Sequence, residues 1–339
     1  MPCRRTAPLA LLTAVLLAGC GATAVDGPGT SSTASSTPEG SAAPSGEDSQ
    51  TVSSCGVETT LETPPERVVT IKSSATEMVL ALGAGDRLVG TAFSDGPLPE
   101  DLAGQAEDVP VLAEQNPSAE AVLELEPDLV YAGWESNLSS DGAGERSMFD
   151  DLGIATYVSP SACREADHQP ERLTFDLVFE EITEVGRILG GDSVDAAERL
   201  VAEQRATLED VRPTGEGRTA LWYSSGNDVP YVGAGIGAPQ MIMDAVGLQN
   251  VAEDVPDTWT SMGWEAVASA DPDVIVLVDS AWNTAESKIE MLESNPVTRR
   301  LSAVQDGRYV VIPFPATEAG VRNVPAAADL SAQLAEVPQ

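Results

Sequence analysis

The sequence offers few residues that could act as catalysts. It contains one histidine, His168, in a polar stretch of the chain. A Ser-His-Asp triad uses a histidine as its base, and catalytic zinc sites use several side-chain ligands, so neither arrangement is easily built here. No HExxH, G-x-S-x-G or phosphate-loop motif is present. These observations favour a binding protein over an enzyme, and they predict no cofactor and no metal site.

Polar and aromatic residues instead follow several expected strands. Ligands of open α/β sheets bind where the strands end, which in a two-lobed protein is the cleft between the lobes. Tryptophans at these positions could stack on a flat ligand. A lysine and an arginine could balance its anionic groups. The predicted binding residues are Lys72, Ser73, Ser74, Trp134, Glu135, Ser136, Trp222, Tyr223, Ser224, Trp259, Trp282 and Arg322.

Each of these assignments has a structural alternative. A tryptophan more often belongs to a core than to a binding surface, and an arginine in a C-terminal helix is usually solvated. The stretch VGAGIGAPQ adds Gly235 and Gly237, which precede a helix expected to begin near Pro239. Free N–H groups at such a helix start can bind an anion, although the glycine spacing is not the dinucleotide-binding fingerprint.

Parallel α/β units must position these residues. The β-branched run at 68–71 is typical of a buried strand, and a helix at 75–82 and a strand at 88–91 follow it. Strands are also expected at 155–158 and within 218–226 and 308–314. The predicted fold class is α/β, with two lobes that are each a small, mainly parallel sheet flanked by helices.

One αβ unit occurs twice in the chain. The stretches PSAEAVLELEPDLVYAG (117–133) and SMGWEAVASADPDVIVLVDS (261–280) each contain a helix-like run, a Pro-Asp pair and a strand, at 129–132 and 274–278. In each, a glutamate stands seven residues before the Pro-Asp pair. The repeat predicts that two similar lobes use this unit in corresponding positions.

The two repeated glutamates are Glu120 and Glu265. An acid in the first turn of a helix is favoured by the helix dipole, by about 0.3–1 kcal/mol. Counted from Asn116 or Ser261 as the N-cap, each glutamate is the fourth residue and misses the third position that a capping box requires. We therefore expect both side chains to face solvent.

Composition divides the chain into five parts. Residues 1–19 form a secretory signal, whose apolar stretch is too short to span a bilayer. The ending Leu17-Ala18-Gly19-Cys20 resembles a bacterial lipobox, which predicts lipidation of Cys20; a plain signal peptide is the alternative. Residues 20–52 are expected to be a flexible tether. A first lobe (53–172), a helical connector (173–212) with one long helix and a second lobe (213–339) follow.

The net charge of the chain limits the classes of partner that it can bind. The net charge is −36, from 54 acidic and 18 basic residues, which argues against nucleic acid and anionic lipid as partners.

The cysteines predict one covalent cross-link. Once Cys3 leaves with the signal and Cys20 carries lipid, Cys55 and Cys163 remain. In an oxidising compartment they favour one disulfide. Two free thiols, or part of a metal site, are the alternatives.

Several motifs resemble those of a known family. The stretch PPERVVTIKSSATEMVLALGAGDRLVGT, the two E-A-V…P-D units, the connecting helix and the lipobox are similar to the class III solute-binding proteins of ABC importers, which take up ferric siderophores, cobalamin and related chelates. The resemblance covers about residues 52–335. It implies a monomeric protein, lipid-anchored at the extracytoplasmic face of the membrane, whose partners are a small molecule, an ABC permease and its ATPase. It also implies that Glu120 and Glu265 dock onto permease arginines.

Other stretches of the sequence resemble a branch of this family and so indicate a class of ligand. YAGWESNLSSDGAGERS, TYVSPSAC and PATEAGVRN look like the actinobacterial branch assigned to the import of a deazaflavin coenzyme precursor of the factor-420 type. This resemblance implies a planar, anionic ligand. A ferric siderophore is the alternative, followed by cobalamin or haem. A tethered sensor or enzyme on the same fold would be a different class of function.

Overall fold

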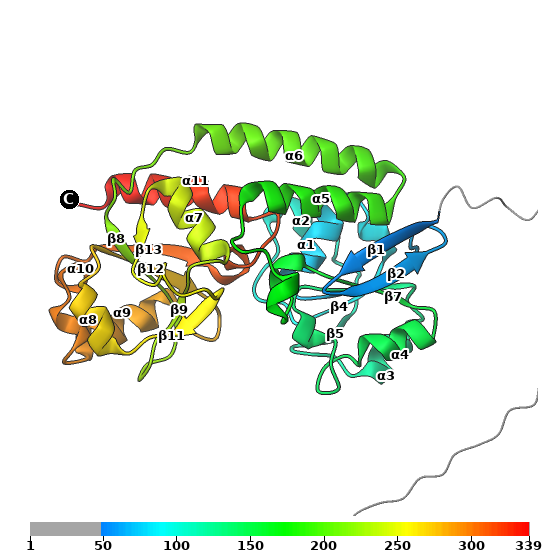
Figure 1. Ribbon diagram of the computed structural model, residues 1–339, viewed down its shortest axis with the longest axis horizontal. Coiled ribbons are helices and arrows are strands. Elements are labelled where there is room, and N and C mark those ends of the chain that lie inside the picture. The colour runs from blue at the N-terminus through cyan, green and yellow to red at the C-terminus, as the bar shows by residue number, and fades with distance from the viewer. Residues whose placement is uncertain (1–48, 339) are drawn as a thin grey trace, which may run out of the picture. The chain divides into compact units, whose positions relative to one another are not determined.

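The computed structural model describes residues 49–338, which build two α/β lobes side by side (Figure 1). The predicted signal, Cys20 and all but the last four residues of the predicted tether lie outside the described residues. Within the described part, no helix is both long enough and apolar enough to cross a membrane. The two lobes with mainly parallel sheets confirm the predicted fold class.

The first lobe is built on a parallel sheet with the strand order β5-β4-β3-β6-β7. Both central strands, β3 and β6, are buried along their whole length, as their continuous apolar sequences require. The strands are β3 (Val68–Ile71), β4 (Leu88–Ala92), β5 (Val111–Ala113), β6 (Leu129–Ala132) and β7 (Ala155–Val158). The helices are α1 (Ser73–Ala81), α2 (Glu100–Ala103), α3 (Ala119–Leu123) and α4 (Arg146–Asp151).

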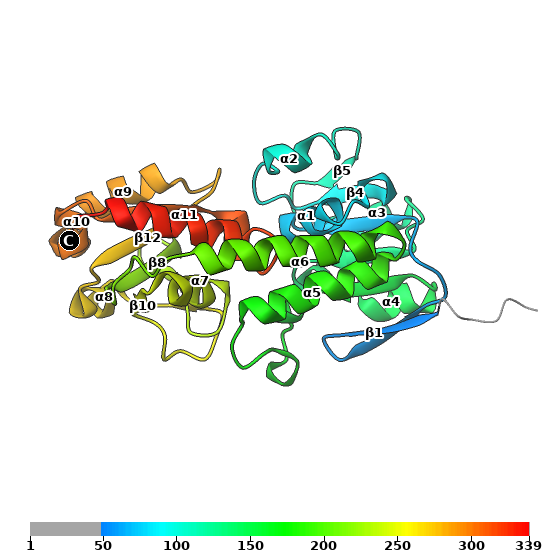
Figure 2. The ribbon, with the colours of Figure 1, turned by 90° about the horizontal axis from the view of Figure 1, so that it is seen from above.

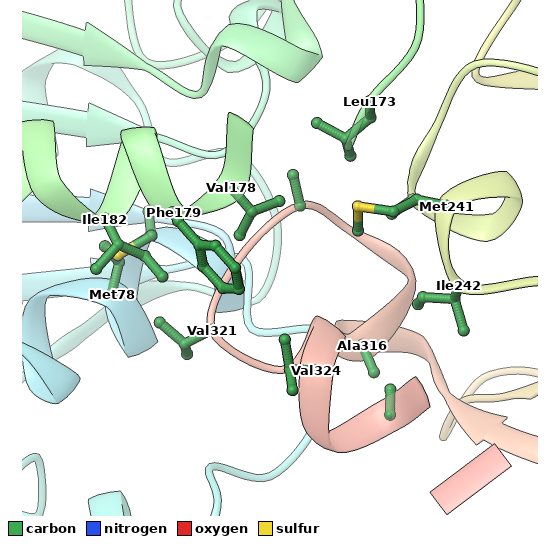
Figure 3. Close-up of a cluster of buried hydrophobic side chains, with 14 of the residues drawn as sticks. Met78, Leu173, Val178, Phe179, Ile182, Met241, Ile242, Ala316, Val321 and Val324 are labelled. Carbon is green, nitrogen blue, oxygen red and sulfur yellow. The ribbon is translucent and has the colours of Figure 1, made fainter. Parts of the chain in front are cut away.

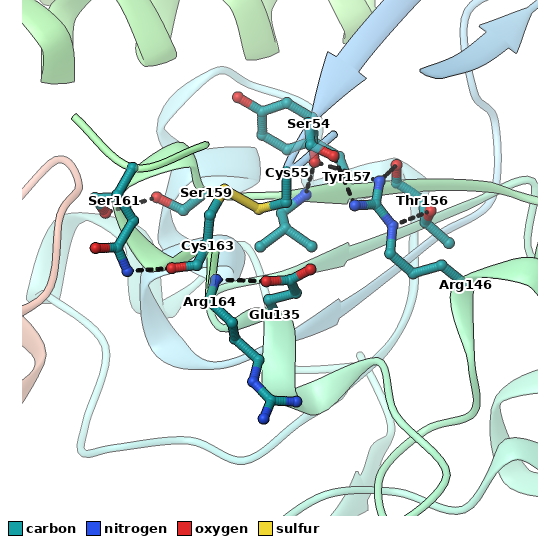
Figure 4. The surroundings of a disulfide bond; sticks show 12 residues. Ser54, Cys55, Glu135, Arg146, Thr156, Tyr157, Ser159, Ser161, Cys163 and Arg164 are labelled. Atoms are coloured by element: carbon teal, nitrogen blue, oxygen red, sulfur yellow. Dashed lines mark hydrogen bonds between the residues drawn. A yellow bond between two sulfur atoms is a disulfide. The ribbon is translucent and has the colours of Figure 1, made fainter. Parts of the chain in front are cut away.

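An antiparallel hairpin precedes this sheet. Its strands are β1 (Gln50–Ser54) and β2 (Val57–Leu61), so β1 begins within the last residues of the segment 20–52 that we expected to be a tether. A disulfide joins Cys55 at the hairpin turn to Cys163 (Figure 4). The buried guanidinium of Arg146 donates to the backbone oxygen of Ser54 and to the hydroxyl of Thr156. These contacts attach the hairpin to β7.

The second lobe has a mixed sheet with the order β11-β9-β8-β12-β13, and β10 also pairs with β8. Its strands β8, β10, β12 and β13 are parallel, whereas β9 and β11 are antiparallel additions. The strands are β8 (Thr219–Ser225), β9 (Tyr231–Gly233), β10 (Gln249–Asn250), β11 (Trp259–Ser261), β12 (Val274–Asp279) and β13 (Tyr309–Pro313). The helices are α7 (Ala238–Val246), α8 (Trp264–Ala270), α9 (Ala285–Ser294), α10 (Ser302–Gln305) and α11 (Asn323–Glu336).

Two helices connect the lobes. The helix α5 (Phe175–Leu189) lies on the first lobe, and α6 (Asp192–Asp210) runs from it to the second lobe, where it packs on α11 (Figure 2). Gly190 and Gly191 join α5 to α6 with φ angles of +65° and +55°, which glycine adopts without strain. The predicted long helix is confirmed, although its N-cap is Gly191 and not Asp192 or Ser193.

The repeated αβ unit takes the same place in both lobes. Helix α3 precedes β6, which pairs with β3, and α8 precedes β12, which pairs with β8. The carboxylate of Asp128 accepts the backbone N–H groups of Glu66 and Arg67 at 2.8 and 3.0 Å. Asp273 accepts the backbone N–H and hydroxyl of Thr219 at 2.9 and 2.8 Å. In each lobe the aspartate of the Pro-Asp pair thus holds the start of the neighbouring strand.

The lobes share one hydrophobic cluster within a single compact unit of the chain. The segment 314–322, between β13 and α11, which we call the bridging segment, enters it from the second lobe. Its Val321 lies near Phe179 of α5 and Met78 of α1, while Ala316 faces the side of Ile242 (Figure 3). The relative position of the lobes is therefore fixed by apolar packing as well as by α6.

An ion pair reinforces this contact. Arg322, at the end of the bridging segment, donates to both carboxylate oxygens of Glu77 on α1, at 2.5 and 2.6 Å. Burial raises the pKa of Glu77, and Arg322 opposes that shift. Glu77 is almost wholly buried, so Arg322 neutralises an internal charge. Arg322, predicted to contact a ligand, thus lies in an internal ion pair and does not line the cavity between the lobes.

Replacing Arg322 tests this pair. Arg322→Met leaves the Glu77 carboxylate buried without its partner, and we expect a loss of about 3–5 kcal/mol in the free energy of unfolding, measured in urea at pH 7. Adding Glu77→Leu should restore much of it. The exposed Arg300→Met is the control, expected within about 0.5 kcal/mol of the parent. Equal effects of the two arginine substitutions would contradict the interpretation.

Candidate ligand-binding site

A cavity of about 390 Å³ opens between the lobes, where several of the parallel strands end. Trp134 follows β6, Ser224 and Ser225 end β8, Trp282 follows β12 and Phe314 follows β13. This is the position at which open α/β sheets bind ligands. The volume falls within the range of pockets for small organic molecules, and the open mouth lets a larger ligand protrude.

Aromatic rings form much of the wall. Tyr231 and Trp259, on the paired strands β9 and β11, are stacked with ring centroids 5.8 Å apart. Trp282 meets Phe314 edge to face, also at 5.8 Å, and is 62% exposed. Trp134 contributes a fifth ring, from the first lobe. The cavity therefore offers flat apolar surfaces from both lobes to a conjugated ligand.

Hydroxyl groups supply most of the polar lining. Ser161 comes from the loop after β7, and the others come from the second lobe: Ser224, Ser225, Thr258 and Thr317. Hydroxyls donate and accept hydrogen bonds equally well. They can thus meet either kind of polar group on a ligand without adding charge.

Lys72 lies behind this wall. Its side chain is fully buried and forms an ion pair with Asp95. The ammonium is 3.5 Å from the centroid of the Trp134 ring and 4.2 Å from that of Phe93. Burial lowers the pKa of Lys72, and the charge of Asp95 opposes that shift. The indole that lines the cavity covers the ammonium, so Lys72, expected at the binding surface, lies behind the cavity wall and does not line the cavity.

The loop of Trp282 depends on the other lysine. Lys288 on α9 donates to the backbone oxygens of Val278 and Asn283, both at 2.6 Å, and so closes the turn between them. Burial lowers the pKa of Lys288 to about 8, while Asp279 opposes the shift. Neither lysine of the chain is therefore available to an anionic ligand.

Glu318 is the carboxylate on the cavity wall. It belongs to the bridging segment, and its Oε2 accepts the indole N–H of Trp134 at 2.7 Å, which links the two lobes. Burial raises the pKa of Glu318, whereas Lys72 and the Trp134 hydrogen bond lower it. Glu318 lies within the stretch PATEAGVRN, but it is not among the predicted binding residues, because its position at the cavity follows from the path of the bridging segment.

The predicted site residues divide into two groups. Trp134, Ser224, Trp259 and Trp282 line the cavity, and the others do not. Because β8 extends to Ser225, Trp222 and Tyr223 are inside the strand and fully buried. Ser73 and Ser74 lie in α1, which begins earlier than predicted. Glu135 accepts the backbone N–H of Arg164, and Ser136 is exposed outside the cavity.

Sequence reasoning missed most of the loop residues in the wall. Leu173, Ser161, Thr258 and Glu318 lie outside the α-helices and strands, and Tyr231 begins the three-residue strand β9, which was not predicted. Gly237, a candidate, does line the cavity at the start of α7. At Gly235 a Cβ atom would lie 2.0 Å from the backbone oxygen of Glu253, so close backbone packing explains that glycine.

The repeated glutamates occupy equivalent surface positions. Both are exposed, and each is the second residue of its helix, after the N-caps Ser118 and Gly263. The predicted caps, Asn116 and Ser261, were two residues too early. Neither side chain is seen in a hydrogen bond or ion pair within residues 49–338.

Two lobes that enclose a cavity and share one long helix define a class of proteins that hold a solute. The chain belongs to the periplasmic binding protein family, whose model matches residues 68–316. It is therefore a binding component and not an enzyme. Across the described residues, no cluster of three or more His, Cys, Asp or Glu side chains could hold a metal ion.

Curated relatives and solved structures agree with this class. The uncharacterized ABC transporter substrate-binding lipoprotein YvrC of Bacillus subtilis is 25% identical over 280 residues, which cover 80% of this chain and 81% of that protein. A cobalamin-binding protein of Halobacterium salinarum is 28% identical over 262 residues, 75% of this chain and 64% of the relative. The structure of an ABC-type Fe³⁺-hydroxamate transport system from Saccharomonospora viridis superposes with a TM-score of 0.72 at 25% identity, covering 84% of this chain and 98% of that one.

The buried position of Lys72 can be tested by substitution. Lys72→Met leaves Asp95 without its counter-charge, so we expect the free energy of unfolding at pH 7 to fall by about 3–5 kcal/mol. The double variant Lys72→Met with Asp95→Asn should regain part of this loss. Urea unfolding followed by circular dichroism measures both. A stable Lys72→Met variant would contradict an internal role for the ammonium.

Proposed function

We propose that the protein is the substrate-binding component of an ABC importer and holds a planar or chelate-type ligand in the cleft between its lobes. The observation that carries the proposal is the cavity walled by Trp134, Tyr231, Trp259, Trp282 and Phe314, at the strand ends of a periplasmic binding fold. Aromatic rings from both lobes suit a ligand that offers two flat faces.

A metal chelate is the ligand class we favour. The Halobacterium salinarum relative is named for cobalamin, and one similar solved structure is named for an Fe³⁺-hydroxamate transport system. Corrinoids and hydroxamate chelates carry many amide or hydroxamate groups, which the lining hydroxyls can meet. Their polar groups do not require a cation, and no lysine, arginine or histidine of the described chain lines the cavity.

A deazaflavin coenzyme precursor is the second candidate. Its ring suits the aromatic walls, but its phosphodiester and carboxylate need compensation. Lys72 and Arg322, expected to supply it, are paired inside the protein. The start of α7 at Gly237 and Ala238 lies in the cavity wall, and free N–H groups at a helix start can donate hydrogen bonds to one anionic group. This observation keeps the precursor as a candidate.

Delivery requires docking to a permease. The exposed Glu120 and Glu265 stand on equivalent helices of the two lobes, so they offer one acidic contact per lobe to arginines of a membrane partner. We further propose that lipid on Cys20 tethers the protein at the extracytoplasmic face of the membrane, with the permease and its ATPase as partners.

Ligand binding can be followed by quenching of tryptophan fluorescence. We expect a corrinoid or a ferric hydroxamate to quench with micromolar or tighter affinity. Trp282→Ala should weaken binding about tenfold or more and leave stability nearly unchanged, because this ring is exposed and stands at the cavity. Val229→Ala, an exposed residue outside the cavity, is the control. Binding of the deazaflavin precursor alone would reverse the order of the two candidates.

Docking is tested separately from binding. The variant Glu120→Ala with Glu265→Ala should abolish ligand uptake in cells while the purified protein keeps its affinity. The matched control replaces two other exposed acids, Glu107 and Glu290, one in each lobe. If the double variant transports normally, or loses affinity as well, the docking role fails.

A further inference from the structure

The charge of the cavity is set by one group. Among the lining residues of the described chain, Glu318 carries the only carboxylate, and no side chain that is cationic at neutral pH is present. The other titratable group is the Tyr231 phenol, whose pKa is raised by burial and nearby acids, so it is neutral at pH 7. A polar ligand therefore meets hydroxyl groups and one acid.

Glu318 is held in a fixed position. The Trp134 indole donates to its Oε2, and the side-chain amide of Asn323 donates to its backbone oxygen at 2.7 Å. No hydrogen bond to its Oε1 is seen within residues 49–338, and the side chain is only partly buried. One carboxylate oxygen is therefore anchored across the lobes, and the other remains able to accept a hydrogen bond at the cavity.

The charges behind the wall do not cancel that of Glu318. Lys72 interacts electrostatically with both Asp95 and Glu318, but its ion pair is with Asp95. When all three groups are ionised, one positive and two negative groups leave one net negative charge at the cavity wall. Charges interact more strongly there than in water, because the surroundings are buried. An anionic group placed beside Glu318 would be repelled, while an N–H or O–H donor would be attracted.

We propose that Glu318 selects the ligand: it accepts a hydrogen bond from an amide, hydroxyl or ammonium group at the floor of the cleft and excludes a carboxylate or phosphate from that position. This inference rests on the proposed function and narrows its ligand class. It also assigns Trp134 a second task, as the positioning residue that orients the carboxylate.

The test uses ligand pairs that differ in the charge of one kind of group. Dicyanocobinamide and dicyanocobyrinic acid share a corrin ring but carry amides and carboxylates respectively. Ferrioxamine B carries an ammonium, which succinylation converts into a carboxylate. Calorimetry with the folded protein should show at least tenfold tighter binding for the amide or ammonium member of whichever pair binds.

A single substitution then assigns the effect. Glu318→Gln keeps an acceptor for Trp134 and removes the charge, so it should weaken the preferred ligand about tenfold and reduce the discrimination within the pair. Glu336 is an exposed acid at the far end of α11, and Glu336→Gln is the control. It should change neither the affinity for the preferred ligand nor the discrimination within the pair. Melting temperatures establish that both variants fold.

The outcomes separate this inference from the proposed function. If the parent protein bound both ligands of a pair with equal affinity, the proposed discrimination against carboxylates would be overturned, even if Glu318→Gln failed to fold. Unchanged discrimination in a folded Glu318→Gln variant would overturn the assignment to Glu318. If neither pair nor any other ferric chelate or corrinoid bound, the chelate proposal itself would fail, and this inference with it.

Discussion

The bridging segment constrains both the relation of the lobes and the composition of the cleft. Its Val321 is buried near the first lobe and its Ala316 near the second (Figure 3), so the segment cannot move without exposing hydrophobic surface. The same nine residues supply Phe314, Thr317 and Glu318 to the cavity and end in Arg322, which pairs with Glu77. Interlobe packing and ligand contacts are thus properties of one short stretch of chain.

This constraint explains why the obvious cations are not ligand residues. A chain with net charge −36 has few bases, and burying acids at an interface requires a counter-charge. Lys72 serves Asp95 and Arg322 serves Glu77, in both cases at nearly dry positions. The cavity is left with hydroxyls, aromatic rings and a single carboxylate. The Arg322 charge is used to hold the bridging segment on the first lobe, and the Lys72 charge neutralises an acid inside the first lobe.

The sequence predicted the parts of the fold that are governed by local patterns. The β-branched run at Val68–Ile71 and the apolar run at Leu129–Ala132 matched β3 and β6 because a strand buried on both faces needs continuous apolar residues. The hairpin β1–β2 was missed because its serines and threonines resemble a linker and its attachment depends on Cys163 and Arg146, far along the chain.

The site was predicted less well than the fold, for a related reason. Residues that follow a predicted strand could be predicted to lie at the cleft, and Trp134 and Trp282, which line the cavity, were predicted in this way. Trp222 was expected at the end of its strand and so at the cleft, but β8 extends to Ser225 and Trp222 belongs to the core. The positions of Glu318 and Thr258 depend on how long loops pack, and no local pattern encodes that packing.

The repeated αβ unit contains one position with an internal role. The aspartates at that position, Asp128 and Asp273, hold the neighbouring strands. Glu120 and Glu265 recur at the same spacing, and neither side chain is seen in a hydrogen bond or ion pair within residues 49–338, which is the observation on which their proposed docking role rests.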